Sequence, residues 1–90
     1  MTEVPTSSQR IDKWLWCARF LKSRSLAADL VEEGHVRVNG RRMDGPDKPV
    51  RVGDVLTIAL ERRVIVARVL SLAARRGPAS EAQQLYTVIE

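Results

Sequence analysis

The stretch from Arg10 to Gly40 most constrains the fold of this 90-residue chain. Apolar residues recur along it at helical spacing, and the pattern is interrupted at Ser23 and Gly34. A serine is favoured just before a helix because its side-chain oxygen accepts a free backbone N–H. A glycine is favoured just after one because it tolerates a positive φ. The stretch therefore predicts two helices that fold sharply back on each other, followed by a strand and a hairpin turn.

The first helix is expected to begin at a cap, Ser7 or Ser8, and to end near Leu21. Its core-facing side is predicted to carry Ile11, Trp14, Leu15, Ala18 and Lys22, with Leu21 at the edge. The opposite side carries Asp12, Lys13, Trp16 and Phe20. We expect Trp16 and Phe20 to pack on another part of the chain, where the segment Leu85–Tyr86 is available. The alternative is stacking on unpaired bases.

The second helix is predicted over Arg24–Glu33, so that Lys22 and Ser23 alone separate the two helices. Its apolar stripe consists of Leu26, Ala27, Leu30 and Val31, and we expect it to pack on the first helix. Strands are then predicted over His35–Val38 and Arg41–Met43. Asn39 and Gly40 between them are typical of a type I′ turn, because both central residues of that turn need a positive φ.

Short extended segments and turns alternate through the rest of the chain. The predicted elements are a loop over Asp44–Pro49, an extended segment over Val50–Val52, strands over Val55–Leu60 and Val64–Leu72 with a turn at Arg62–Arg63, a basic loop over Ala73–Pro78, a helical turn from Ser80 to Gln83, and a strand over Leu85–Ile89. The fold class is therefore α+β, with two packed N-terminal helices against a small, mostly antiparallel sheet of about five strands. We expect residues 1–8 to be flexible and residues 9–90 to form one domain, with a core motif over about 9–60 and a C-terminal hairpin and short segment over 61–90.

The composition is that of a globular protein, with 44% hydrophobic and 29% charged residues. One cysteine, Cys17, excludes an internal disulfide and a Cys-rich zinc site. No apolar run approaches the ~18 residues of a membrane span, and the N-terminus does not resemble a secretory signal. We expect a cytoplasmic monomer that does not bind membranes.

The formal net charge of +4 is concentrated in the predicted helical corner. Five cations there stand against the single acid Asp12: Arg10, Lys13, Arg19, Lys22 and Arg24. The hairpin adds Arg37, Arg41 and Arg42 around its turn. We predict that the corner and the hairpin form one L-shaped concavity, in which the cations and the start of the second helix contact phosphates of structured RNA. The alternatives are a solvated helix face and an edge hairpin protected by its charges.

The sequence contains no pattern typical of an enzyme, a metal site or a cofactor site. It has no glycine-rich phosphate loop and no nucleophile elbow. The one histidine, His35, has no catalytic or metal-binding partner in the sequence. Asp44, Asp47 and Asp54 lie in predicted turns, where aspartate bonds the backbone.

Four blocks of sequence resemble the S4-type RNA-binding domain, named for a ribosomal small-subunit protein and also found in pseudouridine synthases and bacterial tyrosyl-tRNA synthetases. They are RIDKWLW (10–16), SRSLA (23–27), GHVRVNG (34–40) and VGDVL (52–56). This resemblance implies the helix–helix–hairpin fold of the αL-type RNA-binding motif. It also implies an RNA-contacting surface made of Arg10, Lys13, Arg19, Lys22, Ser23, Arg24, Arg37, Asn39, Gly40, Arg41 and Arg42.

The runs DKWLWCARF (12–20) and RGPASEAQQLY (76–86) narrow the resemblance to the heat-shock protein fifteen family of ribosome-associated stress proteins. That family implies binding to ribosomal RNA of the free large subunit while it still holds a nascent chain on tRNA, recycling of stalled subunits, some binding of DNA, and no catalysis. The chain departs from the family's pattern in three places. Position 35 is His where Lys is more usual, the loop over 44–49 is one residue longer, and the sequence ends at Glu90 without the family's basic C-terminal extension. We expect the last of these to weaken ribosome affinity.

Two other classes of function fit the residues. One is the recognition module of an RNA-modifying system, which an adjacent synthase reading frame would favour. The other is a protein-interaction module that uses Trp16, Phe20 and the C-terminal strand, which copurification with a protein but no RNA would favour.

Overall fold

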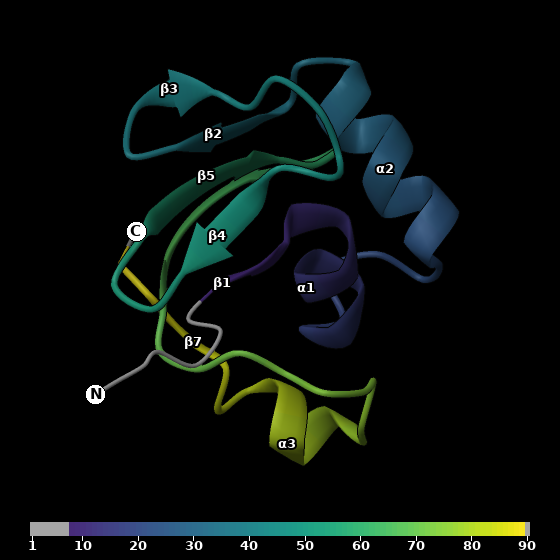
Figure 1. Ribbon diagram of the computed structural model, residues 1–90, viewed down its shortest axis with the longest axis vertical. Coiled ribbons are helices and arrows are strands. Elements are labelled where there is room, and N and C mark those ends of the chain that lie inside the picture. The colour runs from purple at the N-terminus through teal and green to yellow at the C-terminus, as the bar shows by residue number, and fades with distance from the viewer. Residues whose placement is uncertain (1–7, 90) are drawn as a thin grey trace, which may run out of the picture.

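The computed structural model describes residues 8–89, and its α+β architecture confirms the predicted fold class (Figure 1). The helices are α1 (Ile11–Cys17), α2 (Arg24–Glu32) and the single turn α3 (Ala79–Ala82). An antiparallel sheet of the order β3-β2-β5-β6-β7 contains β2 (Val36–Val38), β3 (Arg41–Arg42), β5 (Val55–Ala59), β6 (Val64–Val69) and β7 (Tyr86–Val88). A separate pair joins β1 (Ser8–Arg10) to β4 (Pro49–Arg51). In Figure 1, α3 lies at the opposite end of the molecule from the β2–β3 hairpin.

The start of α1 is not capped by a serine, contrary to the prediction. Its first two amide groups, those of Ile11 and Asp12, instead donate to carbonyl groups of the loop over residues 45–48, across 2.9 and 3.1 Å. Ser8 lies in β1, and the other predicted cap, Ser7, lies outside the described residues, as does the rest of the segment expected to be flexible. The loop therefore satisfies backbone donors that otherwise need a side-chain cap.

The end of α1 comes several residues before the predicted Leu21. Arg19 has a φ of +66°, in the left-handed region. The amide of Phe20 donates to the carbonyl of Leu15 over 3.1 Å, and that of Arg19 to Trp16 over 3.0 Å. These are the two bonds of a Schellman motif, here with an arginine in the position that glycine usually occupies. The connection between the helices is consequently longer than the two residues predicted.

α2 begins and ends where its punctuating residues predict. The Ser23 hydroxyl accepts a hydrogen bond from the amide of Leu26 over 3.1 Å. Gly34 has a φ of +86°, and a second Schellman motif closes the helix. Leu26 does not belong to the buried stripe, because 47% of it is exposed. Ala27 and Val31 carry the buried face of the helix.

Replacing the α2 cap is expected to destabilise the protein measurably. Ser23→Ala leaves an amide of the first turn without its acceptor, at a cost of about 1 kcal/mol in the free energy of unfolding. Urea denaturation followed by circular dichroism measures that loss. Ser25→Ala is the matched control, since Ser25 lies exposed two residues further along, in the first turn of the same helix. Equal stabilities of the two variants would contradict the capping role.

The core lies between the helices and the sheet, around Trp14. Its largest fully buried residues are Trp14, Ile11, Leu15, Leu56, Ile58, Val31, Val36, Val50 and Val69. Trp14 Nε1 donates to the carbonyl of Ser71 over 3.0 Å, which satisfies its one polar group. Phe20 packs on Tyr86 with 4.6 Å between ring centroids, which confirms the predicted contact with the C-terminal strand.

The β2–β3 hairpin has the predicted type I′ character, since φ is +52° at Asn39 and +85° at Gly40. The Asn39 side chain fixes the turn to the neighbouring strand: it donates to the Asp54 carboxylate over 3.1 Å and accepts from the Val55 amide over 2.9 Å. Strand boundaries mostly shift by one residue from those predicted. The largest difference is at the end of β6, which stops at Val69.

Candidate nucleic-acid interface

Three of the predicted cations line one hollow where α1 and α2 begin. Arg10 comes from the end of β1, Lys13 from α1 and Arg24 from the first turn of α2. Ser8, Gln9, Leu72, Ala73 and Ala74 complete the lining, and the hollow has a volume of about 640 Å³. We call this site the basic hollow. The fold therefore brings together cations that are up to fourteen positions apart in the sequence.

A buried carboxylate holds two of these cations in place. Asp12 is 3% exposed, whereas a polar outer face was predicted for it. Its Oδ2 lies 3.0 Å from Arg10 Nη2 and 3.5 Å from Arg24 Nε, and its Oδ1 accepts from the Lys13 amide over 2.7 Å. Its hydrogen bond and its charge both raise the pKa of the Arg10 guanidinium. Asp12 carries one negative charge against the three positive charges of Arg10, Lys13 and Arg24, so these four residues have a net charge of +2, and Asp47 adds a weaker negative influence on Arg10.

A fourth cation, Arg76, lies near the cluster and was absent from the predicted site. Burial raises the pKa of the Cys17 thiol, while the positive charges of Lys13, Arg24 and Arg76 oppose that shift. Arg76 Nε donates to the carbonyl of Trp16 over 3.1 Å, and its guanidinium lies 5.8 Å from the centroid of the Trp16 ring. The basic loop over residues 73–78 was visible in the sequence, but nothing in the local pattern placed it against α1.

The segment over residues 71–77 is bonded to β1, to α1 and to the connection that follows α1. Gln9 bonds the backbone of Ala73 twice, donating to its carbonyl and accepting from its amide. Arg19 Nε donates to the carbonyl of Gly77 over 3.0 Å. The C-terminal part of the chain thus forms one wall of the basic hollow and fixes its shape.

Arg19, Lys22 and Ser23 are not part of this cluster. Arg19 lines a different hollow, together with Phe20, Arg63 and Tyr86. Lys22 is exposed in the connection between the helices. The Ser23 hydroxyl is engaged as the α2 cap.

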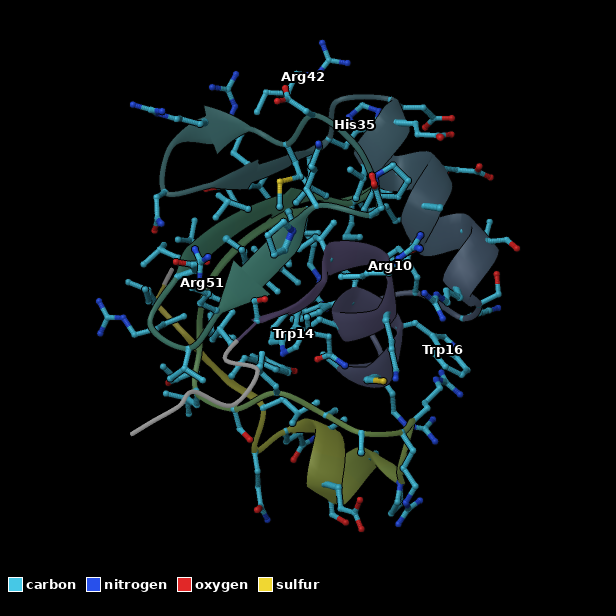
Figure 2. The ribbon with its side chains drawn as sticks, viewed as in Figure 1. Arg10, Trp14, Trp16, His35, Arg42 and Arg51 are labelled. Carbon is cyan, nitrogen blue, oxygen red and sulfur yellow. The ribbon has the colours of Figure 1, made fainter. Side chains whose placement is uncertain are left out.

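The hairpin cations lie at the other end of α2 and do not line the basic hollow. Arg42 Nη2 lies 3.5 Å from the carbonyl oxygen of Glu32, the last residue of α2, whereas Arg24 is the first. Nine helical residues at 1.5 Å each separate the two groups by about 13 Å. Figure 2 shows Arg10 and Arg42 well apart along the molecule.

Within the hairpin, Arg37 and Arg41 are exposed cations. Asn39 and Gly40 shape the turn, and the amide group of Asn39 is already bonded within the chain. We call Arg37, Arg41 and Arg42 the hairpin arginines.

Other kinds of site find little support in the described part of the chain. Over residues 8–89, no group of three or more His, Cys, Asp or Glu residues is arranged to hold a metal ion. None of the helices in that range is long and apolar enough to cross a membrane.

Comparison with known proteins shows the family to which this chain belongs. The family model of the S4 domain matches residues 9–56, more than half of the chain. This protein belongs to the S4 domain family.

Within that class the chain is similar to heat shock protein 15, as the sequence blocks predicted. It is 45% identical over 89 residues to Heat shock protein 15 of Escherichia coli K12, covering 96% of this chain and 64% of that protein. Identity to the Small ribosomal subunit protein uS4 of Azorhizobium caulinodans is 36% over 72 residues, covering 78% of this chain and 35% of that protein. The chain thus spans less than two thirds of the length of these curated relatives.

A solved structure supports the same likeness. The Heat Shock Protein 15 of Vibrio cholerae, described as trimeric, superposes with a TM-score of 0.85 at 42% identity. The match covers 90% of this chain and 81% of that one.

Proposed function

We propose that this protein binds structured RNA without catalysing a reaction, through the basic hollow and the hairpin arginines. The observation that carries the proposal is the convergence of Arg10, Lys13 and Arg24 on one hollow, around a buried Asp12. A carboxylate that fixes two guanidinium groups reduces the entropy lost when they bind phosphate. The excess positive charge then attracts a polyanion.

The spacing of the two basic groups fits an extended partner better than a small one. About 13 Å of α2 separates them, so a single small anion does not reach both. A folded RNA presents a continuous row of phosphates and 2′-hydroxyls in a wide, shallow minor groove. Selectivity in this proposal comes mostly from the shape of the backbone, since the major groove of RNA is too narrow for side chains to read.

We further propose ribosomal RNA of the large subunit as the target, with a role in recycling stalled subunits in the cytoplasm. The likeness to a small-subunit ribosomal protein supports ribosomal RNA as the class of ligand. The large subunit and the recycling role rest on the resemblance to heat shock protein 15 alone. Cosedimentation with purified large subunits, against small subunits as the control, tests the target. The trimer described for the Vibrio cholerae relative makes oligomeric state a separate question, which sedimentation velocity resolves against the monomer predicted from the sequence.

The affinity for an RNA stem–loop is expected to fall steeply with salt. If Arg10, Lys13, Arg24, Arg37 and Arg41 each neutralise one phosphate, the logarithm of the association constant falls against the logarithm of salt concentration with a slope of about −4. Fluorescence anisotropy at a series of potassium chloride concentrations measures it. A DNA duplex of the same length is the comparison, and we expect it to bind more weakly. Affinity that does not change with salt would contradict phosphate binding.

A further inference from the structure

The basic hollow has an apolar wall that phosphate binding does not use. Leu72, Ala73 and Ala74 line the hollow from the segment after β6. Leu72 and Ala73 are half-buried, and Ala74 is exposed. A phosphate gains nothing from such a surface, whereas a planar, weakly polar group does.

We propose that the hollow seats one unpaired nucleotide of the bound RNA, with its phosphate on the cations and its base against the apolar wall. This inference rests on the proposed function and deepens it, because it names the feature of RNA that the site selects. A base inside a helix is stacked on both faces and is not free to enter. RNA-binding modules that do recognise bases take unpaired ones and stack them on side chains, including the guanidinium plane of arginine.

The size of the hollow suits a nucleotide. Its volume of about 640 Å³ lies within the ~300–1,000 Å³ range of pockets that take small organic ligands. Arg10 and Arg24 both contact Asp12, and two hydrogen bonds from Arg10 to that carboxylate hold the Arg10 guanidinium plane in the lining of the hollow.

The apolar wall is also held in place before any ligand binds. Both backbone groups of Ala73 are bonded to the Gln9 side chain. The neighbouring Ser71 carbonyl accepts from the indole of the buried Trp14. Because the wall is already ordered, a base can pack against it without the loss of conformational entropy that ordering a loop would cost.

The test compares three RNA duplexes with the same number of base pairs, each annealed from two strands so that no loop supplies unpaired bases, measured by fluorescence anisotropy at one salt concentration. The first is fully paired, the second has one bulged nucleotide, and the third has an abasic residue at the bulge. We expect the bulged RNA to bind about tenfold more tightly than the paired one, which is within the range of one stacked base. The abasic RNA is expected to lose most of that gain while keeping the same phosphates.

A variant that fills the hollow tests the location. Ala74→Leu adds bulk at an exposed position of the apolar wall, so we expect the ratio of the affinity for the bulged RNA to that for the paired RNA to fall from about ten to about one. Ala79→Leu is the matched control, because Ala79 is exposed in α3 and is not part of the lining. A preference that survives Ala74→Leu undiminished would overturn the placement of the base.

The outcomes separate this inference from the proposed function. If the paired and bulged stems bind equally well, or if the abasic bulge binds as tightly as the complete one, the nucleotide seat is overturned and RNA binding through the cations stands. If none of the three RNAs binds at low salt, both are overturned. These comparisons use the unaltered chain and do not depend on any variant folding.

Discussion

Reversing one cation in each basic group, Lys13→Glu together with Arg41→Glu, is expected to weaken RNA binding by about 100-fold or more. Lys13 lies in the basic hollow and Arg41 is one of the hairpin arginines. A hydrogen bond to a charged group contributes about 1.5–3 kcal/mol, so two lost contacts account for a change of this size. Each single variant should show an intermediate loss in the same anisotropy titration, because both groups are proposed to contact one RNA.

These two positions separate binding from folding better than Arg10 or Arg24 do. Among residues 8–89, no ion pair involves the side chain of Lys13 or Arg41. A glutamate at position 24 would instead place a second carboxylate against the buried Asp12. Arg62→Glu with Arg63→Glu is the matched control, since it makes the same change in charge at the exposed β5–β6 turn. Equal losses in the two double variants would show that net charge, and not this face, governs binding.

Trp14→Ala is expected to cost about 3–5 kcal/mol in the free energy of unfolding. Trp14 is 0% exposed, and its ring contacts both Phe20 and Tyr86, with centroids 6.1 and 6.4 Å away. The substitution also leaves the Ser71 carbonyl without its donor. The free energy of unfolding of a native protein is only about 5–15 kcal/mol, so this substitution removes a large part of the stability. Urea denaturation followed by circular dichroism measures it.

Trp16→Ala is the control for this substitution. Trp16 is half-buried under the Arg76 guanidinium, and that contact at an exposed site contributes about 0.5–1 kcal/mol. We expect Trp16→Ala to lower the free energy of unfolding by less than half as much as Trp14→Ala does. If the two variants are equally stable, the core is not organised around Trp14 as described.

The two helices illustrate which parts of the fold the sequence predicted. Both ends of α2 were predicted well, because Ser23 and Gly34 are residue types with strong local preferences. Both ends of α1 were missed. Its start is satisfied by the loop over residues 45–48, a contact distant in sequence, and its end places Arg19 in a conformation that arginine rarely adopts.

The same distinction applies to the candidate site. Local charge pattern identified Arg10, Lys13 and Arg24, which the structure brings together. Helical periodicity placed Asp12 on the outer face, but its carboxylate is buried where Arg10 and Arg24 meet it. Arg76 reaches the cluster from a loop after β6, a placement that depends on tertiary structure.

The predicted cations do not all line one hollow, for a geometric reason. The corner and the hairpin are close in sequence, but α2 runs between them and separates them by its full length. Adjacency along the chain therefore did not imply adjacency in space. The two basic groups lie near the two ends of α2, at a spacing that an extended RNA backbone can bridge.

A two-dimensional NMR titration of the isotope-labelled protein with an RNA stem–loop tests this account most directly. We expect the amide signals of Lys13, Arg24 and Ala73 to shift on binding, together with those of the hairpin over residues 39–42. The signals of Arg62 and Arg63 are expected to stay in place. Shifts confined to the β5–β6 turn and β7, with the basic hollow unchanged, would contradict it.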